Sequence, residues 1–109
     1  MRVTIFGTGY VGIVTGACFA EVGNDVLCMD IDSSRIEEIS KGHLPLFEPG
    51  LEALIRKNTA SGKLHFTSDT RQAVDHGELL FIAVGTPLDE RGTADISAVM
   101  AVSNAITPL

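Results

Sequence analysis

Short apolar runs alternate along this chain with longer segments in which apolar residues recur at helical spacing. Four of the runs have the length of strands and lie at Val3–Phe6, Val26–Met29, Leu64–Thr67 and Leu79–Val84. The last run is continuously apolar, which is typical of a central strand that is buried on both faces. Strands that alternate with helices predict a parallel sheet with helices on its faces.

The first two helical segments have recognisable ends. One spans Tyr10–Val22, and Gly23 follows at the position where a left-handed residue commonly ends a helix. The next helix begins after a capping residue at Asp32 or Ser33 and stops at Gly42. Small side chains in the first helix predict that it packs closely on the sheet.

Capping residues also mark the later helices. Pro49 is expected in the first turn of a third helix, where proline is tolerated, and this helix ends at Gly62. Asp69 and Gln72 have the spacing of a capping box at the start of a short helix. Asp95 is expected to cap a last helix near the end of the chain.

A glycine motif joins the first strand to the first helix. The first apolar run leads directly into Gly7-x-Gly9-x-x-Gly12, and the second ends at Asp30, 18 residues after Gly12. Strand, glycines, helix, strand and acid in this order are a dinucleotide-binding fingerprint. The alternative is that the glycines only shape a turn and that Asp30 caps the next helix.

Each residue of the fingerprint has a physical role. Gly7 allows the tight turn, Gly9 lets the backbone approach a pyrophosphate, and Gly12 lets the helix pack on the sheet. The amides of Tyr10, Val11 and Gly12 lack partners within the helix, and the helix dipole adds positive charge there. They are therefore expected to bind the pyrophosphate.

Asp30 is expected to accept hydrogen bonds from the ribose diol of adenosine. A 2′-phosphate about 4 Å from this carboxylate would cost roughly 4 kcal/mol per unit charge at an effective dielectric constant near 20. Asp32 adds a second negative charge nearby, whereas Arg35 could offset part of the repulsion. We therefore favour NAD over NADP and place Arg35 along the adenosine.

These features predict an α/β fold, with a Rossmann-type parallel sheet, helices on both faces and strand order 3-2-1-4. A complete domain of this type needs about two strands more, so residues 1–109 form an incomplete N-terminal domain. The fourth strand then has an open edge, which is a pairing liability. The chain is either the first part of a longer protein or associates with another copy through this edge.

Composition narrows the function classes. The chain has 109 residues, 45% of them hydrophobic, and a net charge of −6, which argues against nucleic-acid and acidic-membrane partners. The first apolar run is too short for a signal peptide, and no stretch is long enough to span a bilayer. The cytoplasm is the expected compartment.

Cysteine and histidine suggest no further chemistry. Cys18 and Cys28 are too few for a disulfide scaffold and are expected to be buried apolar side chains. His43, His65 and His76 are scattered without the spacing of metal ligands, so no metal site is expected.

Three segments together resemble a known family. Ile-Phe-Gly-Thr-Gly-Tyr-Val-Gly (Ile5–Gly12), Leu-Phe-Glu-Pro-Gly-Leu (Leu46–Leu51) and Ala-Val-Gly-Thr-Pro (Ala83–Pro87) occur in this order. The combination resembles the N-terminal part of the nucleotide-sugar dehydrogenases of the UDP-glucose/GDP-mannose dehydrogenase family. The likeness covers essentially the whole chain.

The resemblance implies a reaction and a set of cofactor contacts. The family oxidises a nucleotide-sugar alcohol to a carboxylate in two steps, with two NAD and one water; UDP-glucose gives UDP-glucuronate, a polysaccharide precursor. Tyr10, Val11, Asp30, Arg35 and Thr86 fall on the family's cofactor-contacting positions. Many members have Lys where this chain has Arg35.

The family's catalytic cysteine lies much further along its chains, and neither cysteine here matches it. The alternative for Thr86 is a turn before Pro87 without a cofactor contact. This chain alone is therefore expected to bind NAD without catalysis. GDP-mannose and UDP-N-acetyl-sugar dehydrogenases are alternatives within the family; a non-catalytic NAD-sensing module and the 3-hydroxyacid dehydrogenases lie outside it.

Overall fold

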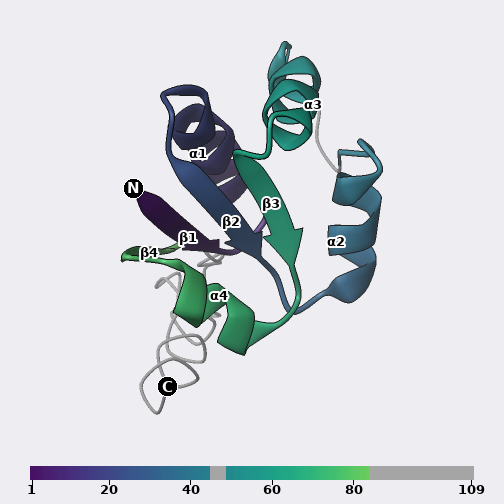
Figure 1. Cartoon of the computed structure of the whole chain (residues 1–109). Helices are drawn as coiled ribbons and strands as arrows, with labels where there is room; N and C mark the ends of the chain where they lie inside the picture. Colours follow the sequence, from purple (N-terminus) through teal and green to yellow (C-terminus); the bar gives the residue numbers. More distant parts are fainter. Residues whose placement is uncertain (45–48, 84–109) are drawn as a thin grey trace, which may run out of the picture.

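A computed structural model describes residues 1–44 and 49–83 of the chain (Figure 1). Strands and helices follow one another in the predicted order, with two consecutive helices between the second and third strands. The elements are β1 (Arg2–Phe6), α1 (Tyr10–Glu21), β2 (Asp25–Met29), α2 (Ser33–Ser40), α3 (Leu51–Ala60), β3 (Leu64–Thr67), α4 (Thr70–His76) and β4 (Leu79–Ile82).

The four strands form one parallel sheet in the order β3-β2-β1-β4. In the central pair Ile5 lies opposite Cys28, and on the other side of β1 the same residue lies opposite Phe81. The predicted α/β class and strand order 3-2-1-4 are therefore confirmed. Their consequence is that the carboxyl ends of β1 and β2 meet at one edge of the sheet.

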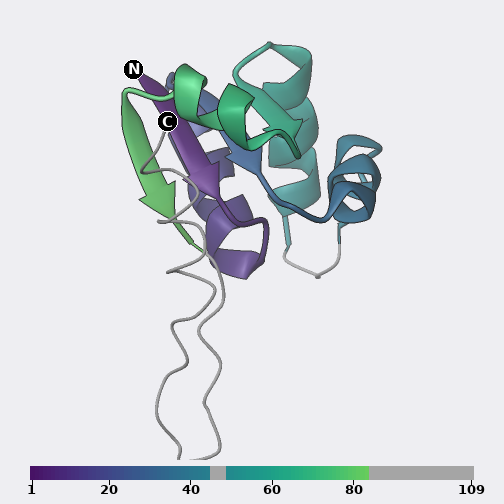
Figure 2. The ribbon, with the colours of Figure 1, turned by 90° about the horizontal axis from the view of Figure 1, so that it is seen from below.

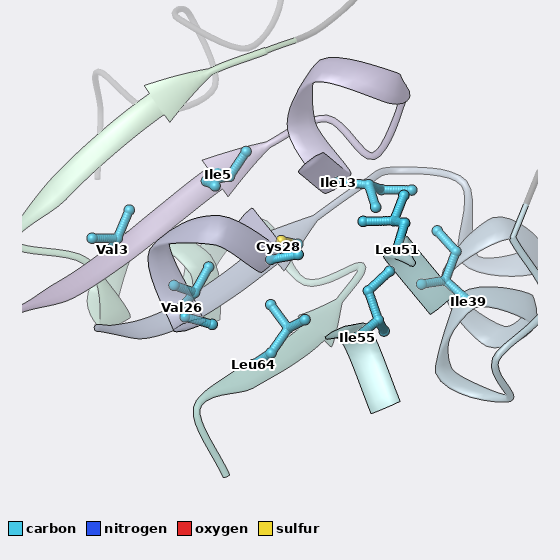
Figure 3. Packing of buried hydrophobic residues seen from close by; sticks show 11 residues of the cluster. Val3, Ile5, Ile13, Val26, Cys28, Ile39, Leu51, Ile55 and Leu64 are labelled. Carbon is cyan, nitrogen blue, oxygen red and sulfur yellow. The ribbon is translucent and has the colours of Figure 1, made fainter. Parts of the chain in front are cut away.

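Helices cover both faces of the sheet. Alternate residues of β1 and β2 point to the face that is covered by α1 and α3, and Ile39 of α2 packs at its margin (Figure 3). The remaining residues point to the opposite face, where α4 packs; Figure 2 shows α4 and α1 on opposite sides of the strands. The buried hydrophobic cluster on the α4 face is smaller than the one on the α1 face and consists of Phe6, Leu27, Met29 and Ala73.

Helix α1 lies close to the sheet because its inward face is made of small residues. A β-carbon at Gly16 would lie 2.7 Å from Sγ of Cys28 and 3.3 Å from Cδ1 of Ile5, closer than ordinary van der Waals contact. Ala17 and Ala20 continue this buried face toward the end of the helix. The predicted close approach of the first helix is thus confirmed.

The helix ends show which predicted caps form. Gly23 adopts a φ of +104° directly after α1, and its amide donates to the carbonyl of Ala20. Asp32 caps α2, since its carboxylate accepts from the amide of Arg35 at 3.2 Å. Of the two capping residues considered for this helix, the structure selects Asp32.

Two details of the later caps differ from the predictions. Pro49 is not in the first turn of α3, because the helix begins at Leu51 after Gly50, which has a φ of +82°. Asp69 caps α4, but the reciprocal half of the capping box is replaced. The amide of Asp69 donates to Oγ1 of Thr67, whose hydroxyl donates to Oε1 of Gln72.

Two burial predictions are wrong. Cys18 is exposed because it lies outside the buried α1 face, whereas Cys28 is buried in the core. Strand β4 is not buried on both faces: Leu79 and Ile82 are 42% and 40% exposed, since β4 is the outer strand of the described sheet. Val84 and the predicted last helix after Asp95 lie outside the described residues.

In the part of the chain that the structure describes, no helix has both the length and the apolar character needed to cross a membrane.

The burial of the two cysteines predicts a difference in reactivity. Burial raises the pKa of the Cys28 thiol to about 12, so this thiol stays protonated and shielded at neutral pH. An alkylating reagent at pH 8 should label Cys18 within minutes and Cys28 only after unfolding. Mass spectrometry of native and urea-treated protein measures both, and rapid native labelling of Cys28 would contradict the packing.

Candidate functional site

The predicted fingerprint residues meet where β1 and β2 end and α1 begins. Gly7 leaves β1 with a φ of +112°, a conformation that favours glycine. Its amide donates to the carbonyl of Met29 at 2.7 Å, which ties the turn to the last residue of β2. The turn and the end of β2 therefore form one unit at this edge of the sheet.

Gly12 is required by packing against the turn. A β-carbon at this position would lie 2.0 Å from the carbonyl oxygen of Gly7 and 2.9 Å from its carbon. Both are backbone atoms, so no side chain could move aside to make room. Glycine at position 12 is thus a condition for α1 to begin where it does.

Gly9 differs from Gly12 because the described residues place no heavy atom within 4 Å of a β-carbon there. Its φ of −73° is one that any residue can adopt. Neither local packing nor backbone conformation therefore requires glycine at position 9. The open space above it fits the role expected from the sequence, which is close approach by a ligand.

The amino end of α1 offers donors and positive potential. Gly9 is the capping residue and has no side chain to accept from the first-turn amides, and this turn contains no acidic residue. The first amides of a helix lack intrahelical partners, and the dipole is positive there. Tyr10 and Val11 are 53% and 62% exposed, so this turn is open to an anion.

Asp30 follows β2 and is bound by both neighbouring segments. Its Oδ2 accepts from the hydroxyl of Thr8 at 2.7 Å and from the amide of Thr8 at 3.1 Å. Its Oδ1 accepts from the amide of Asp32 at 3.0 Å. These hydrogen bonds hold the carboxylate beside the glycine turn.

The surroundings of Asp30 favour its charged form. Burial raises the pKa of this carboxyl, but hydrogen bonds from the Asp32 amide and from the Thr8 hydroxyl and amide lower it. The Arg35 guanidinium, whose Nη1 lies 3.8 Å from Oδ2, lowers it further. The net result is a pKa below the usual value, so Asp30 is an anion at neutral pH.

Arg35 and Asp32 both make local contacts at the start of α2. Arg35 extends from α2 toward Asp30, while its amide donates to the carboxylate of Asp32 as part of the helix cap. Asp32 is therefore a capping residue, and its carboxylate accepts a hydrogen bond from the first turn of α2. Thr86, the remaining predicted cofactor residue, lies outside the described residues.

Thr8 is the contact that sequence reasoning missed. It lies between Gly7 and Gly9, is fully buried, and donates two of the three hydrogen bonds that the Asp30 carboxylate accepts from the described residues. The fingerprint leaves this position unspecified, so its spacing rules contain no signal for it. The available clue was a hydroxyl side chain between two glycines at a strand end.

The histidines contact carboxylates and carbonyls. His43 pairs with Glu38, and His65 and His76 lie 3.7 and 3.8 Å from Oδ1 of Asp25. Across residues 1–44 and 49–83, no group of three or more His, Cys, Asp or Glu side chains is arranged to hold a metal ion.

The site residues present fit a dinucleotide. First-turn amides without intrahelical partners and a helix dipole can bind a pyrophosphate, the space that the described residues leave at Gly9 allows it to approach, and an anionic Asp30 can accept from a ribose hydroxyl. Of the cofactor positions predicted from the sequence, the structure brings together Gly7, Gly9, Tyr10, Val11, Gly12, Asp30 and Arg35.

Comparisons with known proteins identify sequences and structures that are similar to this chain. Residues 1–109 match the model of the UDP-glucose/GDP-mannose dehydrogenase family, NAD binding domain. A curated relative, UDP-glucose 6-dehydrogenase of Rhizobium meliloti (strain 1021), is 49% identical over 97% of this chain and 24% of its own length.

Solved structures show the same likeness. A ternary complex of GDP-mannose dehydrogenase from Pseudomonas aeruginosa has a TM-score of 0.92 at 40% identity, over 97% of this chain and 24% of that one. A UDP-glucose dehydrogenase from Pyrobaculum islandicum has a TM-score of 0.91 at 36% identity, over 97% and 25%. The chain thus spans about a quarter of the length of these relatives.

Adding one methyl group is predicted to destabilise the fold at Gly12 much more than at Gly9. Gly12→Ala should destabilise the fold by about 3 kcal/mol, because the methyl group meets backbone that cannot move freely. Gly9→Ala is the matched control and should change the free energy of unfolding by less than about 1 kcal/mol. Urea unfolding followed by circular dichroism measures both; equal losses would contradict this division of roles.

The lowered pKa of Asp30 predicts part of the acid sensitivity. A carboxylate with a depressed folded-state pKa contributes stability that is fully present above its unfolded value, near 3.9, and is lost as pH falls through the folded value. Asp30→Asn should therefore be less stable than wild type at pH 7, and the difference should shrink below about pH 4. Urea unfolding of both proteins at pH 7, 5 and 3 tests this. A difference in the free energy of unfolding that stays the same at all three pH values would refute it.

Proposed function

The chain belongs to the UDP-glucose/GDP-mannose dehydrogenase family as an NAD-binding domain, and from this premise we propose how its residues hold the cofactor. The observation that carries the proposal is the turn at Gly9, where space left open by the described residues, amides without intrahelical partners and the positive end of α1 coincide. The pyrophosphate binds there, to the amides of Tyr10, Val11 and Gly12.

Asp30 and Arg35 bind the adenosine end of NAD. The Asp30 carboxylate accepts from the ribose, and Arg35 lies beside the same carboxylate along the adenosine. The family resemblance adds Thr86, in Gly-Thr-Pro, as a further cofactor contact. Bound NAD supplies the hydride acceptor; the chain's own residues bind and orient it.

The anionic Asp30 favours NAD over NADP. A 2′-phosphate beside this carboxylate would meet repulsion of about 4 kcal/mol per unit charge at 4 Å and an effective dielectric constant near 20. Arg35 offsets only part of this repulsion, since its guanidinium already lies 3.8 Å from Oδ2 of Asp30. The discrimination therefore comes from a carboxylate whose charge the fold stabilises.

For the whole protein we propose oxidation of UDP-glucose to UDP-glucuronate with two NAD. This proposal is supported by the 49% identity to a UDP-glucose 6-dehydrogenase, over the quarter of that enzyme's length that the chain spans. Residues 1–109 then form its cofactor domain, and the catalytic cysteine and most sugar contacts lie outside them. GDP-mannose is the second candidate substrate, because the Pseudomonas GDP-mannose dehydrogenase superposes with a TM-score of 0.92.

The proposed site predicts selective binding by the 109-residue chain. Calorimetric titration should show NAD binding in the micromolar to millimolar range and no binding of NADP. Asp30→Ala should weaken NAD binding by at least about tenfold, the usual effect of losing a hydrogen bond to a charged group. Gly9→Ala, which is expected to keep its fold, should also bind NAD more weakly, since its methyl group occupies the space above the turn.

Equal affinity for NAD and NADP would refute the role of Asp30 while leaving the pyrophosphate site intact. Absence of binding by the folded wild-type chain would refute the site itself.

A further inference from the structure

The two oxygens of Asp30 have unequal surroundings. Oδ2 accepts from the Thr8 hydroxyl at 2.7 Å and the Thr8 amide at 3.1 Å, whereas Oδ1 accepts from the amide of Asp32 alone among the described residues. A carboxylate has about four acceptor positions, two on each oxygen. Thr8 fills both on Oδ2, so the remaining position lies on Oδ1.

Hydrogen bonds are needed to select this orientation. The two oxygens of a carboxylate are chemically equivalent and the terminal torsion of an aspartate is broad, so the side chain has little intrinsic preference for the direction in which a free acceptor position points. Nη1 of Arg35, 3.8 Å from Oδ2, attracts the carboxylate from the α2 side. The hydroxyl and amide of Thr8 hold it from the side of the glycine turn.

The buried hydroxyl of Thr8 depends on Asp30 as its hydrogen-bond partner. It is fully buried, and a buried hydroxyl that lacks a partner is costly, so its Oγ1 is held to Asp30 wherever the turn is formed. The glycine turn is itself fixed to β2 by the hydrogen bond from the Gly7 amide to the carbonyl of Met29. The position of the carboxylate is thereby coupled to the pyrophosphate-binding turn.

We infer that Thr8 is a positioning residue for the cofactor: by occupying Oδ2 of Asp30, it presents Oδ1 to a ribose hydroxyl of the adenosine. This inference rests on the proposed NAD-binding function and adds a residue to it. It assigns the hydroxyl of Thr8, rather than its bulk, a role in ribose recognition.

The test compares Thr8→Val, which keeps the shape and removes the hydroxyl, with Thr8→Ser, which keeps the hydroxyl. NAD affinity of the 109-residue chain is measured by calorimetry from pH 3 to pH 8. Thr8→Val should bind NAD about tenfold more weakly at pH 7. It should also lose binding at a higher pH than wild type does, because Asp30 then takes up a proton more readily. Thr8→Ser should restore both properties.

A merely structural effect of Thr8 has a different signature. It would weaken binding equally at every pH, and it would persist when Asp30→Asn is also present. If Thr8 acts through Asp30, adding Thr8→Val to Asp30→Asn should change NAD affinity less than about twofold. Thr8→Ala provides the same comparison if Thr8→Val does not fold, as judged by circular dichroism.

The outcomes separate the two proposals. If wild type binds NAD and Thr8→Val binds it with the same affinity and the same pH profile, the role of Thr8 is overturned. The proposed function then still stands. Absence of NAD binding by folded wild type would overturn the proposed function and this inference with it.

Discussion

The contact between Gly12 and the carbonyl oxygen of Gly7 is the constraint on which this structure depends. A methyl group at position 12 would lie 2.0 Å from that oxygen, so α1 begins directly on the β1 turn only because the side chain is absent. Gly16 repeats the constraint one turn later, against Cys28 on β2. Together the two glycines set the distance from helix to sheet, and hence where the first-turn amides lie relative to the end of β2.

A second constraint, the Asp30 carboxylate, joins the elements that this packing brings together. It accepts from Thr8 in the turn and from Asp32 at the start of α2, and Arg35 lies beside it. The edge of the sheet therefore has positive potential at the amino end of α1 and negative charge at the end of β2. This arrangement suits a ligand with an anionic centre and a hydroxylated end, as a dinucleotide has.

The strand order could be predicted from the sequence because apolar runs, caps and glycines agreed with one another. The exposure of Cys18 could not, because the small residues of α1 leave its inward face poorly marked by hydrophobicity. The exposure of β4 depends on its place at the edge of the described sheet, which an apolar run does not specify. The contact of Thr8 with Asp30 joins residues 22 positions apart, and no periodicity rule covers such a pair.

The acidic composition bears directly on how such a chain can bind phosphates. Its net charge is −6, so long-range attraction does not favour an anionic ligand. Screening at physiological ionic strength reduces the influence of exposed carboxylates beyond about 8 Å. The local electrostatic field at the turn therefore determines whether an anion binds there. At the turn that field comes from backbone amides, which do not titrate and which point outward from a helix held in place by Gly12. The turn thus suits an anion through backbone amides, and the stabilised carboxylate of Asp30 lies at the end of β2, where it can reject an additional phosphate.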